Sequence, residues 1–388
     1  MLEKLTIRGF KSIENMVDFP LFPVNVLIGS NGAGKSNLIE FFKMLRAMMG
    51  LRIAEFGDYK PSLARFLENK GGLSAFLFGG LQRTKEISAE AWFNHGKNAY
   101  RFSLVPTADG EHRIGKEEFF YGGFCPSMGW WDEAGEKESV LPQKCQDAKK
   151  DNAQTRFAYI YEAISSWQIY QFHDTSQFAG VRQPSLVSAT DGFHFDGSNL
   201  AAFLLALKTG RLPGLPPEDC EESYGNIVET IRLAAPYFDD FVLDPYLEGN
   251  GEKVKLQWRQ KDMLATFQPH HVSDGTLRFI CLATALLQPR PPQLIIIDEP
   301  ELGLHPEALA VLAELIRSCS TRTQLILATQ SPTFADCFLP EDIVTVQRRD
   351  GASVFERQSA ERLGPWLETY SLGQLWQKNV IRGGISND

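Results

Sequence analysis

The sequence predicts an α/β fold built around a parallel sheet, and two parts of the chain carry this prediction. In the last third, helical and strand patterns alternate in the order helix 274–287, strand 293–297, helix 306–318 and strand 323–328. Such alternation is typical of βαβ units, whose strands pair in parallel. Near the start, the apolar stretch 24–28 runs directly into a glycine-rich loop, and a helical pattern follows over 37–49.

The region between these parts predicts additional strands and helices. Residues 2–8 alternate apolar and polar side chains like a strand, and residues 85–105 favour two strands joined by a turn at 95–98. Residues 107–155 are polar, charged and rich in Gly and Lys, so we expect an insertion or a mobile loop there. The remaining predicted elements are helices near 156–168, 198–209 and 225–235 and strands at 240–247 and 253–258.

Composition places the chain among globular proteins. Its 388 residues exceed one average domain, so two lobes are expected, and 43% hydrophobic with 22% charged residues argues against disorder. The net charge of −9 argues against a protein that coats nucleic acid by bulk charge, although binding through a local basic groove remains an alternative. Without a C-x-x-C pair or an apolar stretch near the roughly 20 residues that span a bilayer, we expect a cytoplasmic protein with no membrane partner.

The strongest motif is the glycine-rich loop at 29–36, which matches G-x-x-x-x-G-K-[ST]. Its glycines permit the backbone angles that turn successive N–H groups toward a phosphate. Lys35 would supply positive charge to the β- and γ-phosphates of ATP, and Ser36 a hydroxyl ligand for Mg²⁺. A chance match is the alternative, but the strand before the loop and the helix after it are the context that the motif requires.

A second motif follows the apolar strand at 293–297. Asp298 and Glu299 come at the end of this strand, where open α/β sheets bind their ligands. We expect Asp298 to hold Mg²⁺ and Glu299 to act as general base or to orient the attacking water. An exposed acidic turn is the alternative, and the P-loop elsewhere in the chain weighs against it.

A third motif opens the helix predicted at 274–287. Ser273 can cap this helix, and Ser273 with Gly275 leaves backbone donors open to a phosphate. Taken alone, an ordinary helix cap is the better interpretation. Its place shortly before the acidic pair favours a binding role instead.

Together, these motifs resemble the ABC-type ATPase heads of the RecF, SMC and Rad50 group, and especially short RecF-like and OLD-like bacterial AAA-family ATPases. The loop 29–36 resembles Walker A, and Asp298 with Glu299 resembles Walker B. The segment 273–275 resembles the signature motif, with Asp274 where transporters usually have Gly. Gln330 stands where the switch histidine usually lies.

The resemblance implies a fold and a set of site residues. The fold would be a mixed-sheet core lobe with an antiparallel β-region (1–106 and 290–388) and an inserted, helical signature lobe (107–289). Catalytic roles are implied for Glu299, Lys35 and Gln330, and Mg²⁺ ligation for Ser36 and Asp298. The implied nucleotide-binding residues are Lys11, Ser12, Asn31, Gly32, Ala33, Gly34, Lys35, Ser36, Asn37, Ser273 and Gly275.

The resemblance also implies a mode of action. Two heads would form a homodimer through ATP, with Walker A of one protomer facing the signature helix of its partner. Hydrolysis would release the dimer and so control a separate effector protein, in phage defence or DNA repair. A stand-alone ATPase that binds DNA is one alternative, which the net charge disfavours. A transporter motor subunit is another, which Asp274 and Gln330 disfavour.

Overall fold

A computed structural model describes residues 1–51, 61–122, 129–133, 137–150, 157–249, 251–263 and 265–381. The chain divides into two compact units, and each is described by itself. The P-loop unit comprises Met1–Ile169, Gln293–Ile296 and Gln324–Asp388, and the helical unit comprises Tyr170–Pro292 and Ile297–Thr323.

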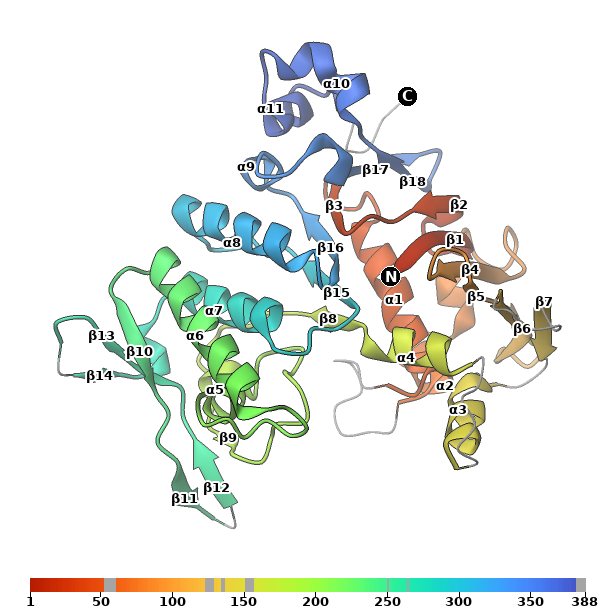
Figure 1. Ribbon diagram of the computed structural model, residues 1–388. Helices are drawn as coiled ribbons and strands as arrows, with labels where there is room; N and C mark the ends of the chain where they lie inside the picture. Colours follow the sequence, from red (N-terminus) through yellow and green to blue (C-terminus); the bar gives the residue numbers. More distant parts are fainter. Residues whose placement is uncertain are drawn as a thin grey trace. The chain divides into compact units, whose positions relative to one another are not determined.

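The P-loop unit contains an antiparallel sheet (Figure 1). Buried and half-buried side chains alternate along its strand β4, as the period of two of a strand with one face in the core requires. Its strands lie in the order β2 (Ile13–Pro20), β1 (Leu2–Phe10), β4 (Ile87–Phe93), β5 (Asn98–Pro106), β6 (His112–Tyr121) and β7 (Gly129–Glu133).

A mixed sheet carries the P-loop. The order of its strands is β18 (Ala352–Arg357), β17 (Ile343–Arg349), β3 (Val24–Ile28), β16 (Gln324–Thr329), β15 (Leu294–Asp298) and β8 (Gln168–Tyr170). Strand β3 pairs in parallel with both β16 and β17, which confirms the predicted parallel pairing, whereas β18 runs antiparallel to β17. All five residues of β3 are buried, because this strand is covered on both faces.

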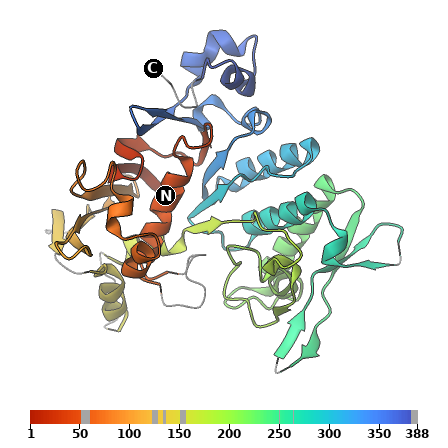
Figure 2. The same cartoon turned by 180° about the vertical axis from the view of Figure 1, so that it is seen from behind.

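Helix α1 (Lys35–Met48) contributes to the hydrophobic core of the P-loop unit together with residues of both sheets. Phe41 lies edge-on against both Phe10 and Phe42, and all three rings are fully buried. The other helices of this unit are α2 (Leu63–Glu68), α3 (Leu141–Lys150), α4 (Ala158–Ser166), α9 (Pro332–Ala335), α10 (Ala360–Leu367) and α11 (Leu372–Gln377). In Figure 2, α10 and α11 follow the β17–β18 hairpin in blue.

Of the insertion or mobile loop expected at 107–155, the loop is wrong for most of the described residues, which form strands and a helix. Strand β6 pairs along its whole length with β5, β7 extends the same sheet, and α3 follows. Charged residues interrupt the pattern of this strand, because Arg113 and Lys116 are exposed whereas Glu117 and Glu118 are buried alongside the core residues Ile114 and Phe119. Residues 123–128, 134–136 and 151–156 of the expected loop lie outside the described part of the chain.

The helical unit is built on α5 (Leu200–Lys208), α6 (Pro217–Ala234), α7 (Asp274–Leu287) and α8 (Pro306–Cys319). Helix α7 packs against α5, α6 and α8, and most of its residues are buried. Its two small sheets have the strand orders β10 (Phe238–Val242), β13 (Gln257–Gln260), β14 (Thr266–Phe267) and β11 (Tyr246–Glu248), β12 (Gly251–Val254), β9 (Ser185–Leu186).

The two strands expected at 240–247 and 253–258 are therefore four shorter strands. Pro245 separates β10 from β11 because proline has no N–H to donate to a sheet. The two units also differ from the expected domains, since the described residues of 107–169 fall in the P-loop unit and 297–323 in the helical unit. None of the described helices combines the length and apolar character needed to cross a membrane.

Candidate nucleotide site

The β17–β18 hairpin packs closely against the P-loop through a backbone carbonyl of β17 and a side-chain hydroxyl of β18. A side chain at Gly29 would place its Cβ 2.4 Å from the carbonyl oxygen of Val346, so the approach of β17 requires glycine there. Gly34 has a φ of +117°, and a Cβ would lie 2.0 Å from the Ser353 hydroxyl. Both glycines of the motif are thus required by close packing, and Gly34 also by its left-handed backbone.

Lys35 lies beneath this loop. Its side chain is buried, and its ammonium group donates to the carbonyl oxygens of Gly29 and Ser30. The Ser30 hydroxyl is buried and has no hydrogen-bond partner among the described residues, and Ser36 at the start of α1 is exposed. A buried cation, unpaired and exposed hydroxyls and the N-terminus of a helix form a donor set that fits a nucleotide phosphate and its cation.

Lys11 and Ser12 lie beside the P-loop, but other protein groups engage their side chains. The Lys11 ammonium pairs with Glu40, whose second oxygen accepts from Lys70 at 2.5 Å. Burial raises the pKa of Glu40, but hydrogen bonds from both lysines outweigh this effect, so the pKa lies below its ordinary value. The buried Ser12 hydroxyl accepts from the Asn37 amide at 2.6 Å and lies 2.6 Å from the Ser353 hydroxyl, so it packs against the loop.

The remaining predicted residues of this loop differ in exposure. Asn31 and Gly32 are exposed at its tip, whereas Ala33 is fully buried. Gln330 follows β16, whose last residue pairs with the last residue of β3, so it emerges at the sheet edge from which the P-loop leaves. Gln330 is exposed there.

The acidic pair ends strand β15, as the sequence predicts. Asp298 is the last residue of the strand, and Glu299 has a φ of +47°, which is uncommon for a residue with a side chain. Such strain often marks a functional position, because packing must hold it. Within the helical unit, both residues line a crevice with His173 and Arg278. His173 belongs to no recognisable motif, so the sequence alone does not indicate its place at this site.

The predicted signature residues lie at the N-terminus of α7. The Ser273 hydroxyl caps the helix by accepting from the Thr276 N–H at 3.1 Å. A Cβ at Gly275 would lie 2.0 Å from the carbonyl oxygen of Gly303, so this glycine permits close contact with the segment after the acidic pair. Ser273 and Gly275 line a cavity of about 110 Å³ with Leu304.

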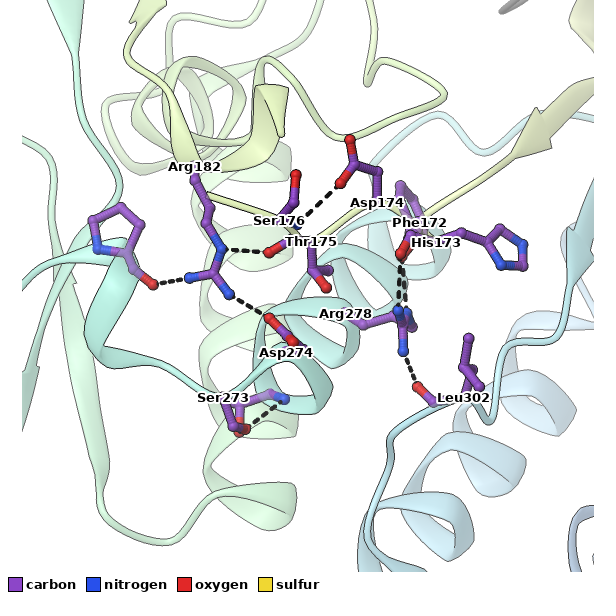
Figure 3. Close-up of polar contacts among 12 residues, drawn as sticks. Phe172, His173, Asp174, Thr175, Ser176, Arg182, Ser273, Asp274, Arg278 and Leu302 are labelled. Atoms are coloured by element: carbon purple, nitrogen blue, oxygen red, sulfur yellow. Dashed lines mark hydrogen bonds and ion pairs between the residues drawn. The ribbon is translucent and has the colours of Figure 1, made fainter. Parts of the chain in front are cut away.

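Two arginines tie this helix terminus to other segments of the helical unit (Figure 3). Arg182 donates to the Thr175 carbonyl at 2.7 Å, to the Pro269 carbonyl and to the Asp274 carboxylate at 2.6 Å. Asp274 thus has a partner that a glycine at the same position would lack.

Arg278 on the next turn of α7 donates to carbonyl oxygens of Phe172 at 2.8 Å, His173 at 3.2 Å and Leu302. Its burial lowers the pKa of the guanidinium group, although nearby acidic groups oppose this effect. This role of Arg278 was not predictable, because arginines that bond to distant carbonyls leave no pattern in the sequence.

The structure thus gathers the predicted residues in two places. Within the P-loop unit, residues 29–37, Lys11 and Ser12 lie around the start of α1, and Gln330 follows β16 at the sheet edge from which the P-loop leaves. Within the helical unit, Ser273 and Gly275 lie at the start of α7, and Asp298 and Glu299 line the crevice with Arg278.

A protein family described as "AAA domain, putative AbiEii toxin, Type IV TA system" matches residues 24–120 and 163–336, which together make up more than half of the chain. The chain belongs to this AAA-domain family. The matched segments include the P-loop, the α7 terminus and the acidic pair, whereas the β17–β18 hairpin lies beyond them.

Two curated proteins are similar to this AAA-domain chain. It is 37% identical over 95 residues to the DNA replication and repair protein RecF of Renibacterium salmoninarum, which covers 24% of the chain and 22% of that protein. It is 20% identical over 353 residues to the OLD nuclease of Thermus scotoductus, which covers 87% of the chain and 60% of that protein. The chain therefore spans less than two thirds of either relative.

Two solved structures share the fold. A crystal structure of the SmcHead bound to the C-winged helix domain of ScpA has a TM-score of 0.57 at 17% identity, covering 94% of this chain and 99% of that one. A head domain from Pyrococcus furiosus with an extended coiled coil has a TM-score of 0.55 at 16% identity, covering 95% and 98%. The family match shows a P-loop ATPase with an AAA domain, which is similar to RecF and OLD proteins, and the solved structures show the fold of an ATPase head.

Proposed function

We propose that this ATPase is a nucleotide-driven dimer switch that controls a separate effector protein, in phage defence or DNA repair. The observation that carries the proposal is the exposed N-terminus of α7, where the cavity beside Ser273 offers an anion site without a P-loop of its own. Tyr237, which is 45% exposed, places its hydroxyl 3.3 Å from that of Thr276 in the first turn of α7. The exposed apolar residues Leu233 (68%) and Leu302 (45%) adjoin in sequence Ala234 and Gly303, which line the cavity. Such a surface suits a second copy whose bound ATP would reach the cavity.

The proposed chemistry assigns one task to each predicted residue. Lys35 binds the β- and γ-phosphates, Ser36 and Asp298 hold Mg²⁺, and Gln330 approaches the γ-phosphate. Glu299 accepts a proton from the attacking water, and its strained backbone fixes where the carboxylate points. Mg²⁺ would offset the negative charge of the phosphates when bound.

The test of the switch is the size of the particle in solution. Ser273→Arg places bulk and positive charge at the α7 terminus, so we expect each protomer to bind ATP without forming an ATP-dependent dimer. Its ATP affinity should fall only by the amount that dimerisation adds in wild type. Light scattering with ATP and Mg²⁺, beside calorimetric ATP binding, measures both properties.

Ser359→Arg is the matched control. Ser359 caps α10 in the same manner, since its hydroxyl accepts from the Arg362 N–H. This variant loses a helix cap without touching α7 and should still dimerise. A dimer of unchanged stability in Ser273→Arg would contradict the proposal.

DNA binding is the second candidate function, because the matched RecF relative is a DNA replication and repair protein. Under this alternative, the ATP-bound protein would bind duplex DNA with an affinity that falls steeply as salt rises. Fluorescence anisotropy at two salt concentrations, with ATP and with ADP, tests it. The net charge of −9 requires any such contact to be a local basic surface.

A further inference from the structure

The hairpin that braces the P-loop also carries a cation at its tip. Strands β17 and β18 are joined by Asp350 and Gly351, which have φ values of +51° and +81°. Two residues in the left-handed region are typical of a tight type I′ turn, which fixes the residues on either side. Arg348 and Ser353 are direct cross-strand partners next to this turn, so their side chains share one face of the hairpin.

This face is the one that meets the P-loop. The buried Ser353 hydroxyl donates to the Ala33 carbonyl at 2.6 Å and lies 2.6 Å from the Ser12 hydroxyl. The Arg348 guanidinium lies 3.5 Å from the carbonyl oxygen of Gly32, the residue before Ala33. The cross-strand pair therefore contacts two successive carbonyls of the loop, one through a buried hydroxyl and one through a cation.

The alternation of β17 supports this placement. Val344 and Val346 belong to the same hydrophobic core as Ala33 and the residues of α1. Arg348 is two residues further along the strand and so continues this face beyond the core. Arg349 points to the opposite face and is exposed.

The surroundings of Arg348 favour a ligand. Its described polar contacts are the carbonyl oxygens of Gly32 and Gly351, and no carboxylate pairs with it in the described part of the chain. A Cβ on Gly32 would meet nothing within 4 Å, so the space over the loop tip is open. A guanidinium group without an acidic partner beside a phosphate-binding loop suits an anionic group bound there.

We propose that Arg348 is a further nucleotide-binding residue, which contacts the α-phosphate end of the bound nucleotide. This inference rests on the proposed assignment of the P-loop as the ATP site. The strand order indicates how the nucleotide would be oriented. Strand β16, which leads to Gln330, lies on one side of β3, and β17 lies on the other. With the γ-phosphate toward Gln330, Arg348 contacts the part of the nucleotide that ATP and ADP share.

Calorimetric titration with ATP and with ADP, each with Mg²⁺, tests the inference. Arg348→Ala should weaken the binding of both nucleotides about tenfold, the effect of losing one charged hydrogen bond. Arg348→Lys should lose less affinity than Arg348→Ala, because lysine retains the positive charge but not the planar guanidinium group. Arg349→Ala removes the same charge from the opposite face, so both affinities should stay within about twofold of wild type.

The outcomes separate this inference from the proposed site. Equal affinities for Arg348→Ala and wild type would overturn the role of Arg348 and leave the P-loop site intact. A loss for ATP alone would also overturn it, because Arg348 would then contact the γ-phosphate. Wild-type protein that binds neither nucleotide would instead overturn the P-loop site itself. A melting temperature for Arg348→Ala like that of Arg349→Ala excludes unfolding as the cause.

Discussion

The P-loop and the α7 terminus are both helix N-termini suited to phosphate, but the protein holds them by different means. In the P-loop, two glycines lie so close to a carbonyl oxygen of β17 and a hydroxyl of β18 that a side chain at either position would clash. The α7 terminus is held from a distance by Arg182 and Arg278, which reach carbonyls in separate segments. The first arrangement fixes a shape, whereas the second links several segments that can respond together.

The largest expected effect concerns the acidic pair Asp298 and Glu299, which lies in the same unit as the α7 terminus. Glu299→Gln retains size and hydrogen bonding but loses the basic carboxylate, so hydrolysis should fall by a factor on the order of 10²–10⁴. ATP binding, which we assign to the P-loop, should stay within about twofold of wild type. A phosphate-release assay beside calorimetry measures both. The exposed Glu307→Gln should hydrolyse normally, and near-normal hydrolysis by Glu299→Gln would exclude it as the base.

The next effect tests the rigid brace of the P-loop. Gly34→Ala combines a left-handed φ with a clash against Ser353, which together cost about 3 kcal/mol and weaken ATP binding on the order of 100-fold. Gly32→Ala has the same backbone cost, but its new methyl group meets no neighbour, so its ATP affinity should fall only about tenfold. Similar losses in the two variants would show that β18 does not shape the loop.

A smaller effect tests the arginine network of α7. Arg278→Met leaves three carbonyls without their donor, and we expect a loss of about 3 kcal/mol in the free energy of unfolding. Hydrogen exchange in the segments around His173 and Leu302 should rise together, because one side chain bonds to both. The exposed Arg211→Met should leave exchange unchanged. Faster exchange in only one segment would contradict the link.

The smallest effect is the pH dependence of the ion pairs beside α1. The pKa of Glu40 is lowered in the folded chain, so its contribution to stability is present above the ordinary glutamate pKa of about 4.3. That contribution disappears as the pH falls through the lowered value. Wild type should therefore be more stable than Glu40→Gln at pH 7, and the two melting temperatures should converge in acid. A difference that persists at low pH would contradict the ionic account.

Local patterns predicted the elements that carry the motifs. Helix α7 begins and ends at the predicted residues, and β3, β15, β16 and α8 lie within about a residue or two of their predicted bounds. They were predictable because buried strands and amphipathic helices leave periodic patterns. Strand β6 was not predictable, because its charged residues interrupt the alternation of apolar and polar side chains.

By itself, the sequence determined the P-loop, the acidic pair and the capped start of α7, because each depends on residues adjacent in the chain and on the turn or helix end that they form. Only the tertiary structure decided what holds them. Ser353 reaches Ala33 from 320 residues away, and Arg278 reaches Phe172 across 106. A hydroxyl or guanidinium group that bonds to a distant carbonyl selects no residue type there, because every residue has that carbonyl. Such contacts therefore leave no trace in a single sequence.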